Sequence, residues 1–214
     1  MYLTIYLIGE YVDVMGKKRK KKPQQPPAMS PKRYVKEKAR SLPFGPCYAS
    51  QDLSGTEGEK GLFQIILTRA KPSGKFVIGF YLVDAWCLGL KNTFLQPNAD
   101  EEKLAEIVDT VSAAEDQPLV QVEYPWAHHL IYGAIAYAKP LGFEPHKDFA
   151  LTRYVLAPED AIEEPFDFEF GKDGKPLLMV GPHDNGPKLI ATLRQTVGEG
   201  NFEYIMPIGG DGFV

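Results

Sequence analysis

The segment from Leu62 to Val83 constrains the fold of this chain more than any other stretch. Two runs rich in β-branched and aromatic residues, Leu62–Thr68 and Phe76–Val83, flank the sequence KPSGK, whose proline and glycine suit a tight turn. This pattern predicts an antiparallel hairpin. In the second run, apolar residues occupy odd and even positions alike, so neither face of the strand suits contact with water. We therefore expect the hairpin at the centre of a sheet that is covered on both sides.

Four further segments predict helices. They cover residues 31–42, 99–114, 124–139 and 186–197. Ser30 is a typical N-cap before a proline, and the second segment opens with acidic residues, as the helix dipole favours. Apolar residues recur every four positions in the third segment, which predicts one buried face. Asn185 is expected to begin the last helix and Gly198 to end it.

A second hairpin is expected in the C-terminal half. The sequence FDFEFGKDGKPLLMVG, residues 166–181, places Asp173 and Gly174 at a turn between two strands. Residues 201–208 predict a last strand. Both hairpins share an outline of strand, Gly-Lys turn, strand and helix. We therefore predict an α+β fold, with one compact domain, a mostly antiparallel sheet and two hairpin-helix halves.

Charge divides the chain into a basic tail and an acidic body. Residues 16–40 contain eleven Lys or Arg and one acid, a net charge of +10, whereas residues 41–214 carry −12. The run KKRKKKPQQPP has no apolar residue, so burial cannot offset the entropy lost on ordering it. We predict a disordered basic arm at residues 1–29 and an α+β domain at residues 30–214. With 44% hydrophobic residues, the domain can bury a sizeable core.

The first fourteen residues, MYLTIYLIGEYVDV, do not fit a secretory signal. No positive charge precedes the apolar run, two acids interrupt it, and no small-residue cleavage site follows. The run is also too short to span a bilayer. The native chain is expected either to start at Met15 or to begin with a real short strand, unless the segment is foreign to it. The two cysteines, Cys47 and Cys87, are too few for a disulfide framework, which predicts a cytoplasmic protein.

The predicted arm carries an unbroken run of basic side chains: Lys17, Lys18, Arg19, Lys20, Lys21 and Lys22. Such a run predicts weak, salt-dependent binding to RNA or DNA without sequence preference. In a eukaryotic cell it would also match a nuclear-import signal, and the alternative is a tail that only increases solubility. The acidic body is expected to supply no second basic surface. Binding would then depend on the arm alone.

Asp84 is the first candidate for a catalytic residue, because it ends the hairpin within GFYLVDAWCLGLKNTF. A carboxylate at the end of a buried strand can serve as a metal ligand or a base. The other interpretation, which we predict, is a structural acceptor of hydrogen bonds from nearby backbone or from Asn92 or Thr93. Cys87 has apolar neighbours and is expected in the core, and Gly89 suggests a bulge or a close backbone approach.

His146 and Asp148, in the sequence EPHKDF, are the other catalytic candidates. Asp148 follows two residues after His146 and is placed to orient its ring, and a locally satisfied turn is the alternative. His128 and His129 are adjacent on a helix and cannot chelate one ion, so one is expected inside the protein and the other in solvent. Phosphate loops, dinucleotide fingerprints and nucleophile elbows are missing from the sequence. We predict no metal site and no cofactor.

Three separated motifs, YLVDxxCLGxKxTF, LGFEPHKDF and VGEGNF, resemble those of a family of hypothetical bacterial proteins. The resemblance extends from about Ser30 to Phe202. It implies a bacterial, cytoplasmic protein with a variable N-terminus, which agrees with a start at Met15. It implies no activity and no catalytic residue for any position of this chain.

Two functions follow as hypotheses. The first is a non-enzymatic binding or adaptor protein, which contacts nucleic acid or a ribonucleoprotein through residues 17–22 and a protein partner through its acidic body. The second is a metal-dependent nuclease or hydrolase that uses Asp84, His146 and Asp148. This enzyme would require the three side chains to converge. We favour the adaptor, and neither hypothesis involves a membrane.

Overall fold

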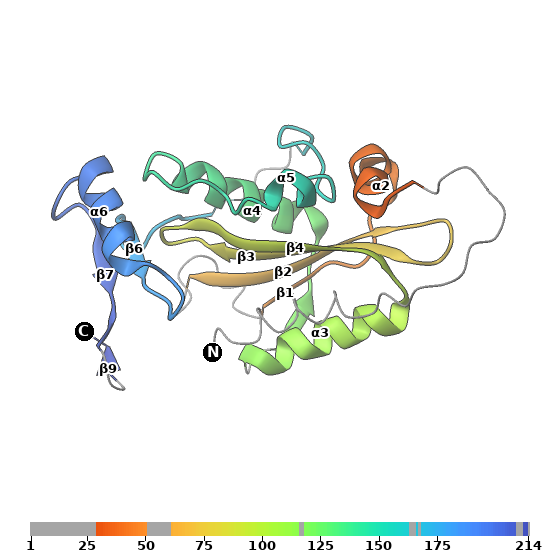
Figure 1. Cartoon of the computed structure of the whole chain (residues 1–214), viewed down its shortest axis with the longest axis horizontal. Coiled ribbons are helices and arrows are strands. Elements are labelled where there is room, and N and C mark those ends of the chain that lie inside the picture. The colour runs from red at the N-terminus through yellow and green to blue at the C-terminus, as the bar shows by residue number, and fades with distance from the viewer. Residues whose placement is uncertain are drawn as a thin grey trace.

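The computed structural model describes residues 29–50, 61–115, 118–162, 166, 168–208 and 212–213 (Figure 1). The predicted arm, apart from Met29, and residues 51–60 lie outside these residues. The helices are α2 (Pro31–Lys38), α3 (Glu101–Glu115), α4 (Tyr124–Ala138), α5 (Phe149–Thr152) and α6 (Gly186–Thr196), with a 3₁₀ turn at Ala39–Ser41. The strands are β1 (Tyr48–Ser50), β2 (Leu62–Ala70), β3 (Phe76–Asp84), β4 (Gly89–Ala99), β5 (Leu119–Gln121), β6 (Leu177–Met179), β7 (Glu203–Ile205), β8 (Pro207–Ile208) and β9 (Gly212–Phe213).

The principal sheet has five strands in the order β4-β3-β2-β1-β5, and all of its pairings are antiparallel. The expected hairpin forms its centre, since β2 and β3 pair without interruption from Leu62 opposite Asp84 to Ala70 opposite Phe76. The α+β class with a mostly antiparallel sheet is therefore confirmed.

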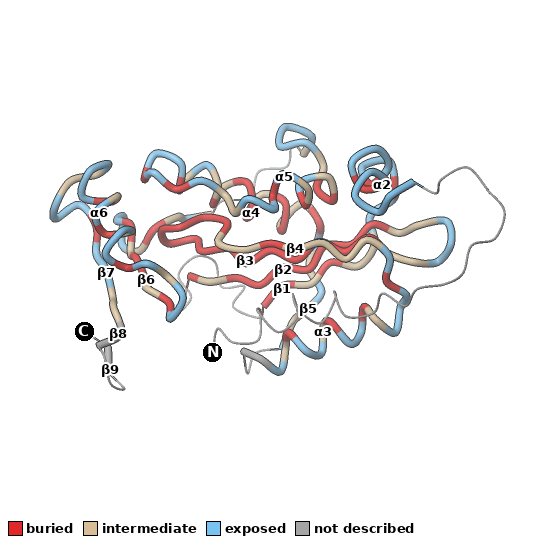
Figure 2. Tube along the Cα trace, in the orientation of Figure 1, coloured by how far each residue is buried: buried red, intermediate tan, exposed pale blue. Residues whose placement is uncertain are grey.

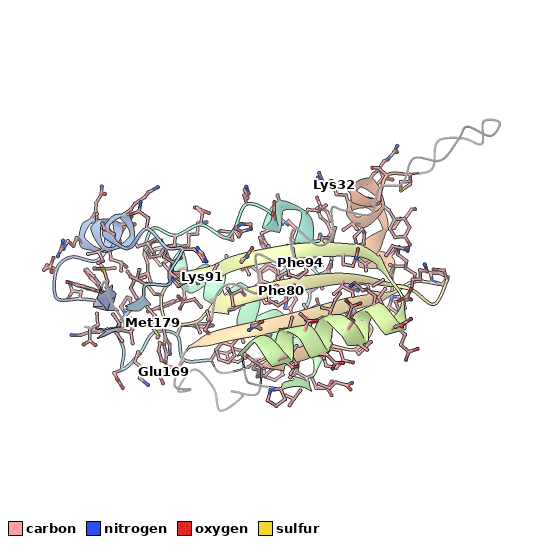
Figure 3. The ribbon with its side chains drawn as sticks, turned by 60° about the horizontal axis from the view of Figure 1, so that its bottom comes forward. Lys32, Phe80, Lys91, Phe94, Glu169 and Met179 are labelled. Atoms are coloured by element: carbon pink, nitrogen blue, oxygen red, sulfur yellow. The ribbon has the colours of Figure 1, made fainter. Side chains whose placement is uncertain are left out.

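Helices cover both faces of this sheet (Figure 1). α2, α4 and α5 lie over one face, where Val77, Tyr81 and Val83 of β3 join the largest apolar cluster. α3 lies over the other face, where Ile78 and Phe80 pack with leucine, isoleucine and valine side chains of the helix. Figure 2 shows the resulting buried layer along the middle strands, and Figure 3 shows Phe80 beside Phe94 above α3. The prediction that both faces of this strand are buried is confirmed.

β4 was not predicted, and it begins with two irregular features. Gly89 has a φ of +66°, and a Cβ added there would lie 2.8 Å from the backbone oxygen of Ala134 in α4. The close backbone approach expected at this glycine is therefore present. Val83 pairs with Leu90 but Leu82 pairs with Asn92, so Lys91 is the extra residue of a β-bulge.

The predicted second hairpin is wrong beyond its turn. Asp173 does adopt a left-handed conformation, with φ 50°, and Lys172 bridges to Lys175 across it. However, β6 pairs with β7 and runs parallel to it, so it is not one arm of an antiparallel ladder. β6 and α6 instead contribute to a separate apolar cluster that includes Cys87, which is fully buried as expected. Two equivalent hairpin-helix halves are not formed.

The boundaries of α2 and α6 follow the capping signals in the sequence. The hydroxyl of Ser30 accepts a hydrogen bond from the backbone N–H of Arg33, and the side chain of Asn185 accepts one from Lys188. Gly198, at φ +86°, follows the end of α6 as predicted. In the part of the chain that the structure describes, we find no helix with the length and apolar character needed to cross a membrane.

Candidate functional site

Asp84 is held inside the turn that connects β3 to β4. Its Oδ1 atom accepts hydrogen bonds from the backbone N–H groups of Trp86 and Cys87, both at 3.0 Å. Only 5% of the residue is exposed, and this burial raises the pKa of its carboxyl, while the Lys91 ammonium and the backbone N–H groups act in the opposite direction. The predicted bonds to nearby backbone are present, and they make Asp84 a cap of the turn.

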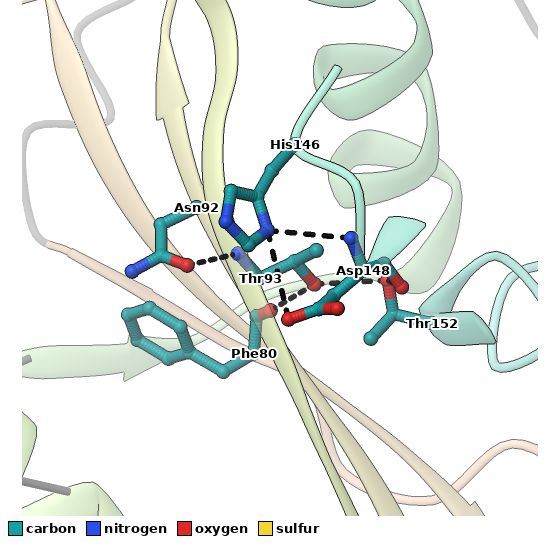
Figure 4. Close-up of polar contacts among 6 residues, drawn as sticks. All are labelled: Phe80, Asn92, Thr93, His146, Asp148 and Thr152. Atoms are coloured by element: carbon teal, nitrogen blue, oxygen red, sulfur yellow. Dashed lines mark hydrogen bonds and ion pairs between the residues drawn. The ribbon is translucent and has the colours of Figure 1, made fainter. Parts of the chain in front are cut away.

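Asn92 and Thr93, the other partners suggested for Asp84, have different contacts (Figure 4). Oδ1 of Asn92 accepts from the backbone N–H of Thr93 at 2.8 Å. The Thr93 hydroxyl donates to the backbone oxygen of Phe80 at 2.6 Å, and its oxygen lies 2.9 Å from that of Thr152. The contact between Thr93 and Thr152 attaches the end of α5 to the sheet.

Lys91 and Asp184 form an ion pair that sequence reasoning missed. Nζ of Lys91 lies 2.8 Å from Oδ2 of Asp184, and the lysine side chain is only 9% exposed. The same oxygen accepts a hydrogen bond from the backbone N–H of Gly181 at 2.8 Å. The bulge of β4 is thereby joined to the loop before α6. The two charges are 93 positions apart in the chain, so no local motif could have indicated them.

His146 and Asp148 lie together between α4 and α5, as the sequence suggested (Figure 4). The backbone N–H of His146 donates to the oxygen of Leu90 at 3.0 Å, which fixes this loop on the edge of the sheet. Nδ1 of His146 accepts a long hydrogen bond, 3.4 Å, from the backbone N–H of Asp148 and lies 3.9 Å from its carboxylate. The backbone of Asp148 therefore orients the ring at least as much as its carboxylate does.

The three predicted catalytic residues do not assemble into a metal site. Within residues 29–50, 61–115 and the other described parts, no group of three or more His, Cys, Asp or Glu side chains could hold an ion. The reason is visible in the contacts. Asp84 is turned into the β3–β4 turn and is almost completely buried, whereas the Asp148 side chain is 60% exposed on the surface.

Two surface cavities flank the His146–Asp148 loop. The first, here called the α6 cavity, has a volume of about 470 Å³ and includes His146 in its lining. The second, here called the α2 groove, has a volume of about 420 Å³ and includes Asp148. Its other charged lining residues are Lys32, Arg33, Lys36, Glu37 and Lys147.

The α2 groove is a basic surface on the folded body, which corrects the expectation that none exists. Arg33 is bonded to Glu37 at 2.6 Å, so the cations that remain are Lys32 and Lys36 of α2 and Lys147 of the loop before α5. All three are exposed. The sequence pattern concealed this surface because Lys147 joins α2 only through the fold.

Comparison with known proteins adds no relative: no protein-family model, curated protein sequence or solved structure matches this chain significantly. The geometry of the two cavities and the charge of the surfaces around them therefore indicate what the protein can bind.

Proposed function

We propose that this protein is a nucleic-acid-binding adaptor, which contacts RNA, DNA or a ribonucleoprotein through its N-terminal arm and the α2 groove. The observation that carries the proposal is the groove itself. Its lysines come from two segments more than a hundred residues apart, and α2 directly follows the basic arm in the chain. Exposed lysines arranged in this way attract a phosphate backbone by releasing its counterions.

The distribution of charge supports one binding face. α2 and the loop before α5 lie on the side of the sheet opposite α3 (Figure 1). The exposed face of α3 carries the acids Glu101, Glu102, Glu106 and Asp109. A polyanion is therefore attracted to the α2 side and repelled from the α3 side. The acidic face remains accessible to a protein partner while nucleic acid is bound.

A fluorescently labelled single-stranded oligonucleotide tests the proposal by anisotropy at several salt concentrations. If the six basic residues of the arm and the three groove lysines each neutralise a phosphate, log affinity should fall against log salt with a slope of about −6. Removal of residues 1–28 should reduce this slope to about −2 without abolishing binding.

The groove is tested by a triple variant, Lys32→Gln, Lys36→Gln and Lys147→Gln. It should weaken binding at every sequence tested and reduce the steepness of the slope by about 2. The matched control, Lys75→Gln with Lys139→Gln and Lys175→Gln, removes the same charge away from the groove. Equal losses in the two triple variants would attribute binding to net charge and contradict a role for the α2 groove.

The metal-dependent nuclease or hydrolase is not proposed. No observation among the described residues favours it, because Asp84 is separate in its contacts from the pair His146 and Asp148.

A further inference from the structure

The α6 cavity is built from three segments that are distant in sequence. One is the start of β4 with the turn before it, the second is the loop between α4 and α5, and the third is the loop before α6 with the first turns of that helix. The ion pair between Lys91 and Asp184 joins the first segment to the third. The backbone bond from His146 to Leu90 joins the second to the first. The cavity is therefore supported by contacts on all of its sides.

Part of the lining is apolar and packed against the core. Leu88, Leu90 and Phe143 are each less than 10% exposed and take part in the buried clusters beneath the cavity. Leu189 of α6 completes this apolar part. A ligand could bury hydrocarbon here at little cost in protein order, as organic ligands do in preformed pockets.

The polar part of the lining is dominated by groups that can carry positive charge. His146, His183 and Lys188 line the cavity from two segments, and Lys91 lies beside them. The two acids of the lining are Glu144 and Asp184, and the second already receives bonds from Lys91 and from Gly181. α6 also begins here, and the positive end of its dipole adds to the attraction for an anion.

We propose that the α6 cavity binds a small organic phosphate, with the phosphate beside His146, His183 and Lys188 and the organic portion against Leu88, Phe143 and Leu189. Two imidazoles and an ammonium from separate segments suit the several oxygens of a phosphate group, which accept charge-assisted hydrogen bonds. The apolar lining distinguishes such a ligand from inorganic phosphate. This binding is independent of the nucleic-acid function proposed above.

The histidines provide a direct measurement, because the chain has only four of them. His146 and His183 line the cavity, whereas His128 and His129 belong to α4 and serve as internal references. The imidazole signals are followed by NMR on the full chain during titration with phenyl phosphate, inorganic phosphate or phenol. Phenyl phosphate should shift the signals of His146 and His183 alone, and it should bind more tightly than either of the other probes.

Two exposed positions test the assignment without disturbing the buried ion pair. His183→Gln and Lys188→Gln should each weaken phenyl phosphate binding about tenfold, because each removes one hydrogen-bond donor to the charged phosphate. Lys139→Gln, which removes an exposed lysine outside this cavity, should leave binding unchanged. Shifts at all four histidines, phenol binding as tight as phenyl phosphate, or equal affinity in all variants would overturn the proposal. Oligonucleotide affinity should not change in His183→Gln, so failure here is distinguishable from failure of the nucleic-acid proposal.

Discussion

Buried polar side chains in this protein differ in whether their polar atoms have hydrogen-bond or charge partners. Asp84 has them, since two backbone N–H groups and the nearby charge of Lys91 act on one carboxylate. Arg69 is 3% exposed and is likewise satisfied, because it donates to the backbone oxygens of Leu42 and Val155 and stacks on Phe44. His128 differs, because its Nδ1 atom is buried and has no hydrogen-bond partner among the residues that the structure describes.

The first prediction at this scale concerns Asp84→Asn. An amide oxygen can still accept from the turn, but it no longer carries the charge that strengthens those bonds and faces Lys91. The free energy of unfolding, measured in urea, should fall by about 1–3 kcal/mol. Asp148→Asn, at an exposed side chain, is the control and should change stability by less than about 0.5 kcal/mol. Unchanged stability of Asp84→Asn together with a lost hydrolytic activity would instead indicate a catalytic carboxylate.

The second prediction at this scale concerns His128, whose burial lowers the pKa of its imidazole. Nε2 lies 3.0 Å from the carbonyl oxygen of Pro158 and donates to it when the ring is neutral. Because the folded-state pKa lies below the unfolded value of about 6.5, the unfolded chain takes up its proton first as the pH falls. The contribution of His128 to the free energy of unfolding is therefore fully present above a pH of about 6.5. It is lost as the pH falls from that value through the pKa of the folded state.

The variant His128→Phe tests this pH dependence, because it removes the titrating imidazole. The variant should be less stable at pH 7.5, where the Pro158 carbonyl loses its donor. The stability difference from the wild type should then shrink as the pH falls from 7 to 5, in urea denaturations at each pH. The other three histidines are common to both proteins and cancel. Parallel pH profiles would show that His128 has an ordinary pKa in the folded state.

Among the elements, those with strong local patterns were predicted and those that depend on distant partners were not. The β2–β3 hairpin follows from its turn and its apolar residues. α2 and α6 follow from their caps, and α4 follows from the spacing of its apolar residues. β4 was missed because polar residues interrupt its pattern on an edge strand. β6 was predicted as a strand, but its pairing was wrong, because its partner, β7, is more than 20 residues away and no turn chemistry specifies a parallel pairing.

The candidate sites follow the same division. The sequence indicated that His146 and Asp148 lie together, because they are two residues apart, and it indicated the hydrogen bonds of Asp84 to the following turn. It gave no sign of the pair between Lys91 and Asp184 or of the α2 groove. Both arise only when segments about a hundred residues apart are brought together by packing of helices on the sheet.

The contact between β4 and α4 allows a prediction about an element boundary. Gly89→Ala would place a methyl group 2.7 Å from the Cβ atom of Ala138 and 2.8 Å from the backbone oxygen of Ala134, in a left-handed conformation. Neither atom belongs to a flexible side chain, so the helix or the strand must shift. We expect a loss of more than about 2 kcal/mol in unfolding free energy.

Gly74→Ala is the matched control for Gly89→Ala. Gly74 also has a left-handed conformation, with φ +74°, but a Cβ added there would meet no atom of the described residues within 4 Å. Its substitution should cost only the backbone strain, about 1 kcal/mol. If both variants lose the same stability, the close approach of α4 to this strand is not a constraint.

At the scale of the whole molecule, one domain from residue 30 onward stays a prediction that limited proteolysis tests. A protease should remove residues before about 32 and leave one resistant fragment, because α6 and β6 share a buried cluster with the end of α4. Two stable fragments, produced by a cut between residues 157 and 164, would contradict the single domain and show that its two parts fold independently.

The position of β1 between β2 and β5 has a consequence for the chain as it is synthesised. The meander of β2, β3 and β4 is complete once residue 99 has left the ribosome, because its pairings are local. β1 is then paired with β2 alone. Its other edge stays unpaired until β5, Leu119–Gln121, is synthesised after α3. A nascent chain that stalls within α3 would expose an unpaired strand on an otherwise finished sheet, and such an edge is a template for association with other chains. Slow translation through residues 100–121 should therefore increase the chance that the unpaired edge of β1 associates with another chain.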